Sequence, residues 1–328
     1  MEILNQSVQT NQTNQTNQTN QTNQTNQIEQ PNQTMTLGDR MKMYENQNLP
    51  ASGKVEKDEY FIIRLDGRSF SNFTSGFTKP FDKIFIKAMC YTAEDLLEKF
   101  ACRTAYCHSD EITLIFTRQW PDENGNYTTT HLFDGRIQKL LSLTAAYASV
   151  RFNWYLMVLI NSSDKYNISY DNSTYKKSFI EKINECEQMF DARIIIFNEQ
   201  NKYEIVNHQI WRSVYDCHRN AVQSYAHHYI GHKKIHGKNC SQMIEMLKET
   251  NIKWDDVATY IKYGFYCKKE LYEKQIDNNV AIRSKQSFKN FKIEFSENMF
   301  ELLLSKYWSD SNSSLNKLIG ENILIDEL

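Results

Sequence analysis

The stretch YFIIRLDGRSF (residues 60–70) joins a short apolar run to an acidic turn. Apolar and β-branched residues at 61–65, interrupted only by Arg64, predict a buried strand that ends at Asp66 and Gly67. Gly67 has no Cβ, so a phosphate group or a metal ion can approach the backbone closely there. The end of this strand is therefore the first candidate site of the chain.

A second acidic turn lies in the stretch YCHSDEITLIF (residues 106–116). Ser109, Asp110 and Glu111 interrupt two apolar runs, which predicts a β-hairpin with the acidic residues at its turn. Residues 81–100, between the two stretches, carry apolar side chains at helical spacing. The predicted order is strand, helix, strand, strand.

Two further elements complete the predicted fold. Residues 135–154 are rich in small residues and predict a helix, and residues 192–197 (ARIIIF) predict a buried strand. The resulting βαββαβ order is the ferredoxin-like split βαβ arrangement of an α/β (α+β) protein. Right-handed crossovers place the end of the first strand beside the hairpin turn, so we expect Asp66 and Asp110 to face each other on neighbouring strands.

Paired carboxylates suggest the chemistry of this site. Two carboxylates brought together repel each other unless a cation neutralises them or one takes a proton. Oxygen ligands without Cys or His favour Mg²⁺ or Mn²⁺ over Zn²⁺. Two such ions about 3.5–4 Å apart support in-line phosphoryl or nucleotidyl transfer. The alternative is that Asp66 starts one turn and Asp110 caps another, without a metal.

Six segments, in this order, resemble the motifs of the tRNA-histidine guanylyltransferase superfamily, whose members add nucleotides in the 3′-to-5′ direction. They are LGDRMKMYE (37–45), IRLDGRSFSNFTSGFTKPFD (63–82), HSDEITLIF (108–116), GRIQKLLSLTAAYAS (135–149), FDARIIIF (190–197) and WRSVYDCHRNAVQ (211–223). LGDRMK, TKPFD and FDAR are more similar to the guanylyltransferase-like branch than to the enzymes dedicated to histidine tRNA. The resemblance covers residues 36 to 270.

The resemblance implies a palm-type catalytic domain with two Mg²⁺ ions, or Mn²⁺, held by Asp66, the carbonyl of Gly67, and Asp110. Glu111 is implied as a third catalytic residue, an outer or alternate ligand, unless it only starts a strand. The implied nucleotide-binding residues for ATP or GTP are Arg64, Asp66, Gly67, Arg68, Ser69, Phe70, Ser71, Lys79, Ser109 and Asp110. Arg64 or Arg68 could instead form a surface ion pair. The dedicated enzymes usually carry His where this chain has Ser71, so a triphosphate contact typical of them is absent or weakened.

The segment from Trp211 to Ile230 predicts a helix with one apolar and one polar side. The predicted core stripe comprises Trp211, Val214, Tyr215, His218, Val222 and Tyr225, and the predicted polar face comprises Arg212, Asp216, Arg219 and Asn220. His218 fits a family motif, but a buried, hydrogen-bonded histidine is an equal alternative. Arg219, Ala221 and Gln223 depart from the dedicated branch and argue against selection of histidine tRNA.

Two basic stretches, residues 230–238 and 260–274, mix lysine with histidine or aromatic residues and are candidates for RNA contact. The candidate tRNA-binding residues are Arg212, His218, Arg219, Asn220, Lys233, Lys234, Lys238, Lys268 and Lys269. A solvated helix end is the alternative for each stretch. His228, His232 and His236 have helical spacing that could suit zinc, but Gly231 and Gly237 interrupt such a helix.

The chain divides into three parts. Residues 1–35 form a tail rich in Thr, Asn and Gln that is predicted to be disordered. The resemblance implies that residues 36–275 form a palm-like nucleotidyltransferase domain. It carries a predicted surface insertion at 161–187 with a short helix near 176–189. Residues 276–328 are a C-terminal extension without a predicted role.

Composition limits the function classes. The formal net charge is −2, so contact with nucleic acid must be local. Seven scattered cysteines without a CxxC spacing predict reduced thiols in an intracellular protein. No transmembrane run and no signal peptide are recognisable, which favours a cytoplasmic location, with the mitochondrion as the alternative.

The family resemblance implies template-dependent 3′-to-5′ addition of nucleotides to the 5′ end of tRNA, with ATP or GTP activating that end. The family suggests a homotetramer, and we expect no membrane partner. The first alternative is a dedicated enzyme that adds a single 5′ G to histidine tRNA. A nucleotide cyclase with a palm fold and a catalytically inactive tRNA-binding module are the others.

Overall fold

The computed structural model describes residues 35–161, 175–276, 279–308 and 319–328. The predicted disordered tail lies outside these ranges, apart from its last residue. Residues 36–328 form one compact unit. No helix among the described residues is long and apolar enough to cross a membrane.

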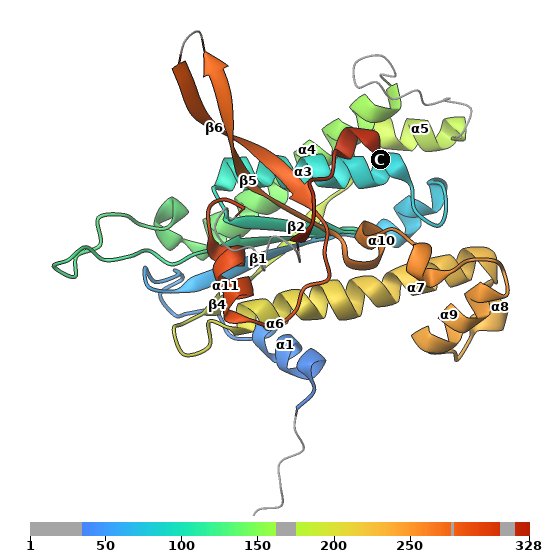
Figure 1. The fold of residues 1–328 in the computed structure, drawn as a ribbon, viewed down its shortest axis with the longest axis horizontal. Coiled ribbons are helices and arrows are strands. Elements are labelled where there is room, and N and C mark those ends of the chain that lie inside the picture. Colours follow the sequence, from blue (N-terminus) through green and yellow to red (C-terminus); the bar gives the residue numbers. More distant parts are fainter. Residues whose placement is uncertain (1–34, 162–174, 277–278, 309–318) are drawn as a thin grey trace, which may run out of the picture. The chain divides into compact units, whose positions relative to one another are not determined.

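A six-stranded sheet with antiparallel neighbours, in the order β4-β1-β3-β2-β5-β6, forms the centre of this unit (Figure 1). The strands are β1 (Tyr60–Gly67), β2 (Thr104–His108), β3 (Glu111–Phe116), β4 (Phe190–Phe197), β5 (Phe265–Ile276) and β6 (Asn279–Lys289). The first four strands have the ferredoxin-like order, so the predicted fold is confirmed. The β5–β6 hairpin adds two strands at the β2 edge.

Strand β1 is buried on both faces, which explains its continuous apolar run. Phe61, Ile63 and Leu65 belong to one hydrophobic cluster, whereas Tyr60 and Ile62 belong to a second. Because successive side chains of a strand point to opposite faces, the two clusters lie on opposite sides of the sheet. The strand therefore holds both layers of the core together and presents its polar end, Asp66 and Gly67, at one edge.

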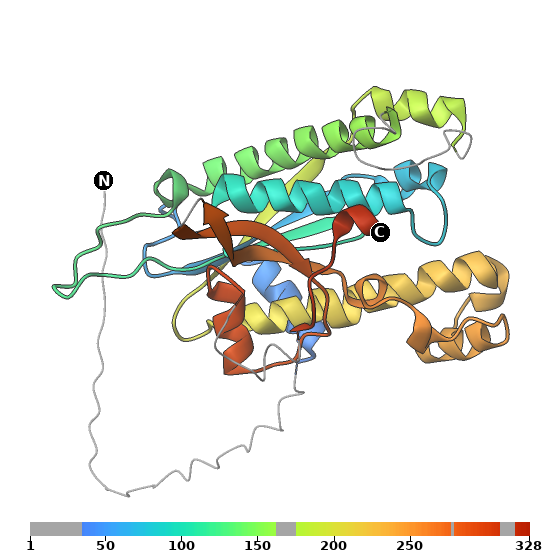
Figure 2. The same ribbon diagram turned by 45° about the horizontal axis from the view of Figure 1, so that its top comes forward.

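Helices α3 (Lys83–Phe100) and α4 (Ile137–Asn161) pack side by side on one face of the sheet (Figure 2). Asp82 caps α3, since its carboxylate accepts hydrogen bonds from the backbone N–H groups of Ile84 and Phe85. The helices predicted at 81–100 and 135–154 are confirmed. The second is longer than predicted.

Helix α5 (Lys177–Asn184) lies within the predicted insertion, at the expected place. Phe179 and Ile183 of this helix, and Tyr175 before it, are buried in the same core cluster as α3 and α4. The insertion is therefore not purely a surface feature, because it contributes aromatic side chains to the core. Residues 162–174 lie outside the described residues.

The opposite face of the sheet carries most of the remaining helices (Figure 2). They are α1 (Leu37–Glu45), α6 (Glu204–Ile210), the π-helix η4 (Trp211–Cys217), α7 (His218–Tyr229) and α11 (Glu297–Leu304). Helices α8 (His232–Ile235), α9 (Cys240–Lys248) and α10 (Thr259–Tyr263) form a smaller cluster with α7. Helix α2 (Phe70–Phe73) is a single turn after β1.

The predicted phase of the 211–225 helix is wrong in its first half. Tyr215, predicted in the core, is 58% exposed, whereas Arg212 and Cys217 are buried. The cause is the π-helical turn η4, because an extra residue per turn rotates the buried side relative to an α-helical pattern. The result is that Arg212 points into the protein.

The C-terminal segment is part of the same structural unit. Strand β6 pairs with β5, and Phe288, Phe291 and Trp308 are buried. The outer half of the β5–β6 hairpin projects away from the sheet (Figure 1) and exposes both basic and apolar side chains. The extension thus completes one edge of the sheet.

Candidate active site

The two predicted acidic turns meet at the ends of the central strands β1 and β3. Asp66 at the end of β1 is paired in register with Glu111 at the start of β3. The N–H of Gly67 donates a hydrogen bond of 2.9 Å to the carbonyl of Asp110. Ser109, which turns the chain from β2 to β3, has a φ of 51°, in the left-handed region. The backbone therefore brings Asp66, Gly67 and Asp110 together, as the sequence predicted.

A tight turn follows Gly67. A Cβ at Gly67 would lie 2.6 Å from the ring of Phe70, so this position requires glycine. Phe70 is buried at 1% exposure and anchors the turn rather than offering its side chain to a ligand. Arg68, Ser69 and Ser71 are exposed, so their side chains and backbone can reach a polyphosphate.

The carboxyl groups of Asp66 and Asp110, the two candidate metal ligands, are costly to ionise in the folded protein. Burial, with added repulsion from Asp66 and Glu111, raises the pKa of Asp110 to about 6. Burial also raises the pKa of Asp66, although Arg64 opposes it. A divalent cation would remove this cost. Within the described residues no three His, Cys, Asp or Glu side chains converge on one point. The candidate donors are the carboxylates of Asp66 and Asp110 and the Gly67 carbonyl, and such an all-oxygen set would fit Mg²⁺ or Mn²⁺.

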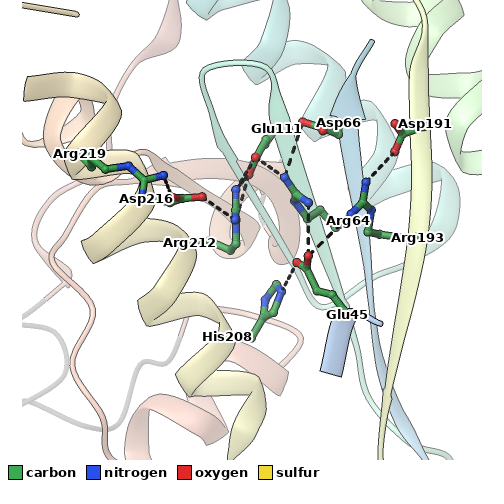
Figure 3. A network of polar contacts seen from close by, with 10 residues as sticks. All are labelled: Glu45, Arg64, Asp66, Glu111, Asp191, Arg193, His208, Arg212, Asp216 and Arg219. Carbon is green, nitrogen blue, oxygen red and sulfur yellow. Dashed lines mark hydrogen bonds and ion pairs between the residues drawn. The ribbon is translucent and has the colours of Figure 1, made fainter. Parts of the chain in front are cut away.

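Glu111 has a different role from the two aspartates. Both of its oxygens accept hydrogen bonds from Arg212, with 3.0 Å between Nε and Oε2, and Arg64 also contacts Oε1 (Figure 3). Burial alone would raise the pKa of Glu111, but Arg212 and Arg64 outweigh it and lower the pKa. Glu111 is thus ionised, and arginines already contact both of its oxygens. This suits a supporting residue better than a metal ligand.

Arg64 and Arg212 are not exposed phosphate or RNA contacts, contrary to the prediction from sequence. Their exposures are 7% and 5%. Arg212 also pairs with Asp216 at 2.6 Å, and Arg64 lies 3.7 Å from Asp66. The sheet and η4 turn both guanidinium groups inward, where carboxylates neutralise them.

A cavity adjoins the acidic edge. Its volume is about 130 Å³, and Lys79, Asp82 and Ser109 are among its polar lining residues. Apolar lining comes from Phe81, Met89 and Phe265, among others. Lys79 donates a hydrogen bond of 2.9 Å to the carbonyl of Thr74, and partial burial lowers its pKa. The cavity therefore combines apolar walls with the amine of Lys79 and the hydroxyl of Ser109, the residue before Asp110.

Comparisons with known proteins agree with this geometry. A family model described as tRNAHis guanylyltransferase matches residues 38–198. The chain is 44% identical over 274 residues to an uncharacterised protein of Acanthamoeba polyphaga mimivirus, an alignment that covers 83% of this chain and 90% of that protein. The chain belongs to the tRNAHis guanylyltransferase family.

Solved structures support the same assignment. A bacterial tRNAHis guanylyltransferase-like protein in complex with ATP is similar, with a TM-score of 0.57 and 26% identity over 82% of this chain and 99% of that one. A bacterial tRNAHis guanylyltransferase-like protein in complex with GTP has a TM-score of 0.50 and 25% identity over 76% of this chain and 90% of that one. Family members are nucleotidyltransferases, so the predicted superfamily is confirmed and the protein is an enzyme of this class.

The prediction that Lys268 contacts RNA is wrong. Lys268 is fully buried, and its Nζ donates hydrogen bonds to Thr104 Oγ1 at 2.9 Å and to the carbonyls of Arg103 at 3.0 Å and Ser305 at 2.6 Å. Burial lowers its pKa to about 7. Lys268 lies on the inward face of β5, which a count of basic residues cannot reveal.

The other RNA candidates differ in exposure. Lys269 pairs with Glu98 at 2.7 Å. His218 is half-buried; its Nε2 accepts a hydrogen bond of 3.1 Å from Trp254 and its ring stacks on Tyr263, which favours the alternative of a hydrogen-bonded structural histidine. The exposed candidates are Arg219, Asn220, Lys233, Lys234 and Lys238.

Sequence reasoning missed Glu45 and His208. His208 is fully buried, and Glu45 has only 7% of its side chain exposed. Glu45 closes the LGDRMKMYE motif, and an acidic side chain at the C-terminal end of a helix was the available signal, because the helix dipole disfavours negative charge there. No pattern around His208 distinguishes it from a core histidine.

Proposed function

We propose that this enzyme adds nucleotides to the 5′ end of tRNA in the 3′-to-5′ direction and selects each nucleotide by pairing with the opposite strand. The observation that carries the proposal is that Asp66, Gly67 and Asp110 meet where β1 ends and β3 begins, beside a cavity lined by Lys79 and Ser109. The motifs of the guanylyltransferase-like branch favour templated addition over the dedicated reaction.

In the proposed reaction, a tRNA 5′-monophosphate first attacks the α-phosphate of ATP or GTP and releases pyrophosphate. The 3′-hydroxyl of an incoming nucleotide then attacks the activated 5′ phosphate and releases AMP or GMP. Mg²⁺ or Mn²⁺ held by Asp66, Gly67 and Asp110 would lower the pKa of the hydroxyl and neutralise the leaving group. A 5′-triphosphate end needs no activation step.

The protein's own residues bind and orient the nucleotide. Lys79, Arg68 and the hydroxyl groups of Ser69, Ser71 and Ser109 offer charge and donors to a triphosphate. The apolar walls of the adjoining cavity fit a nucleobase. Glu111, fixed by two arginines, holds the start of β3 in register with Asp66.

Contact with tRNA is proposed at two exposed regions. Lys233, Lys234 and Lys238 are exposed around α8, and Lys274, Arg283 and Lys285 are exposed on the projecting half of the β5–β6 hairpin. With a formal net charge of −2 for the whole chain, such local clusters are where phosphates would bind.

A homotetramer and a cytoplasmic location, with the mitochondrion as the alternative, belong to the same proposal. Helix α4 exposes Leu143 and Val150, and Met189, which lines a shallow hollow with Val150, is 54% exposed, which offers an apolar surface for a second copy. Sedimentation of the purified protein tests the tetramer. Imaging of tagged protein in cells tests the location.

A templating experiment tests the proposed activity. A tRNA that lacks its first 5′ nucleotide is incubated with protein, Mg²⁺ and all four NTPs, and the 5′ ends of the products are sequenced. Changing the opposing template base from C to A should switch incorporation from G to U. Loss of pairing misplaces the 3′-hydroxyl, and a displacement near 1 Å costs about 10²-fold in rate.

The same experiment separates the alternatives. Addition of G regardless of the template, and only to histidine tRNA, would identify a dedicated enzyme. Formation of cyclic nucleotides from NTPs without RNA would identify a cyclase. RNA binding without any product would identify an inactive binding module.

A further inference from the structure

Glu45, the last residue of α1, is a buried carboxylate that has no part in the reaction proposed above. Its side chain is 7% exposed. His208 Nε2 lies 3.2 Å from Oε1, and Oε2 lies 3.6 Å from Arg64 Nη1 and 3.8 Å from Arg193 Nη1. These partners come from α6, β1 and β4. A charge is costly to bury, so its place among three elements calls for an explanation.

Arg64 connects Glu45 to the candidate metal site. Its guanidinium lies between Glu45 on one side and Glu111 and Asp66 on the other (Figure 3). The distance of 3.7 Å from Arg64 Nη2 to Asp66 Oδ1 is longer than a hydrogen bond. Asp66 is therefore only partly neutralised by Arg64.

Glu45 retains its negative charge. Burial would raise its pKa, but His208, Arg64 and Arg212 hold the pKa below the ordinary value. Burial lowers the pKa of His208 despite the pull of Glu45, so a neutral His208 donates to the carboxylate without cancelling its charge. The negative charge of Glu45 is then available to the two arginines, Arg64 and Arg193.

We propose that Glu45 is a positioning residue that shares the charge of Arg64 and so keeps the Asp66 carboxylate available for the divalent cation. Without the charge of Glu45, Arg64 turns toward Asp66 and competes with the cation. This inference rests on the proposed metal site at Asp66 and Asp110. It assigns to α1 a function at the site although α1 supplies no ligand.

The chain contains a matched control in the same two helices. Arg40 of α1 pairs with Glu204 of α6, with 3.1 Å between Nε and Oε2. This pair also joins α1 to α6, but it is more exposed and does not involve Arg64. Arg40→Gln therefore weakens helix docking without changing the charge around Arg64.

The test measures Mn²⁺ binding by electron paramagnetic resonance of the free ion, without RNA or nucleotide. Glu45→Gln should weaken Mn²⁺ affinity about 10-fold, the lower range for loss of a group that orients a metal ligand. Arg40→Gln should leave the affinity unchanged. Unchanged affinity in Glu45→Gln, or an equal loss in Arg40→Gln, would overturn the inference.

A double variant shows whether Glu45 acts through Arg64. In an Arg64→Gln background, Glu45→Gln should cause no further loss of Mn²⁺ affinity, because coupled residues are not additive. If Glu45→Gln weakens Mn²⁺ affinity as much in the Arg64→Gln background as in the wild type, Glu45 does not act through Arg64. If circular dichroism shows that Glu45→Gln does not fold, Glu45→Asp replaces it. Glu45→Asp draws the carboxylate back from Arg64 and should weaken Mn²⁺ binding less strongly, whereas wild-type affinity would overturn the inference.

The measurement separates this inference from the proposed function. If the wild-type protein binds Mn²⁺ and Glu45→Gln weakens binding, the inference holds even if no nucleotide is added to tRNA. If nucleotides are added and Mn²⁺ affinity does not depend on Glu45, the function holds and the inference fails. A wild-type protein that binds no Mn²⁺ would overturn both.

Discussion

Buried charged side chains lie at two places in the same sheet, around Lys268 on β5 and at the end of β1. The two places differ in how many hydrogen-bond and ion-pair partners those side chains have. Lys268 on β5 donates to carbonyls and a hydroxyl on its neighbours, so its amine is satisfied. At the end of β1, arginines satisfy Glu111, whereas Asp66 and Asp110 have raised pKa values. The difference teaches that a buried polar group with its hydrogen bonds made supports the fold, whereas buried carboxylates without enough positive charge beside them are candidates for binding a cation.

The largest expected effect comes from removing a ligand. Asp66→Ala or Asp110→Ala should abolish nucleotide addition, since a lost metal ligand costs several kcal/mol of transition-state stabilisation. The thermal midpoint should stay the same or rise in metal-free buffer, because carboxylate repulsion is relieved. Single-turnover addition to a 5′-truncated tRNA measures the first, and thermal unfolding measures the second. Retention of more than about a tenth of the activity contradicts the two-metal site.

Lys268→Met should have the opposite profile. The substitution keeps much of the side-chain volume but leaves buried acceptors on Arg103, Thr104 and Ser305 without a donor, at a cost of about 2 kcal/mol in the free energy of unfolding. Urea unfolding measures this loss. The Mg²⁺ dependence of nucleotide addition should be unchanged in the folded variant. A shift in Mg²⁺ dependence would show that the two groups are coupled.

The pH dependence of stability sharpens the contrast at Asp110. Its pKa rises from the ordinary 3.8 to about 6 in the folded protein, so the folded state binds this proton more tightly than the unfolded state. The contribution to stability is complete below about pH 4 and is lost as the pH rises through 6, by about 3 kcal/mol at ~1.36 kcal/mol per pKa unit. In a chelator, the unfolding free energy of wild type relative to Asp110→Asn should fall over this window. A flat difference would mean that Asp110 is not destabilised by its surroundings.

The smallest expected effect belongs to residues 1–34. Their deletion should not change nucleotide addition or tRNA affinity, because a tail of Thr, Asn and Gln carries almost no charge and almost no apolar surface. Binding of labelled tRNA to the truncated and full-length chains measures this. A large loss of affinity would assign the tail a role in binding RNA.

The sequence by itself determined the order of strands and helices and the pair of acidic turns. The apolar runs, the helical spacing and Gly67 are local signals, and the six motifs identified the family without reference to packing. The positions of Asp66 and Asp110 followed from strand order alone, because neighbouring strands must present their ends at one edge.

Only the tertiary structure decided which charged side chains are buried and paired inside the protein. The π-helical turn η4 carries Arg212 inward to Glu111, and the pairing of β5 with β2 buries Lys268. Glu45 and His208 lie far apart in sequence and meet only because α1 and α6 pack on the same face. Local patterns record hydrophobicity and turn chemistry, whereas the neutralisation of a buried charge depends on partners brought together by packing.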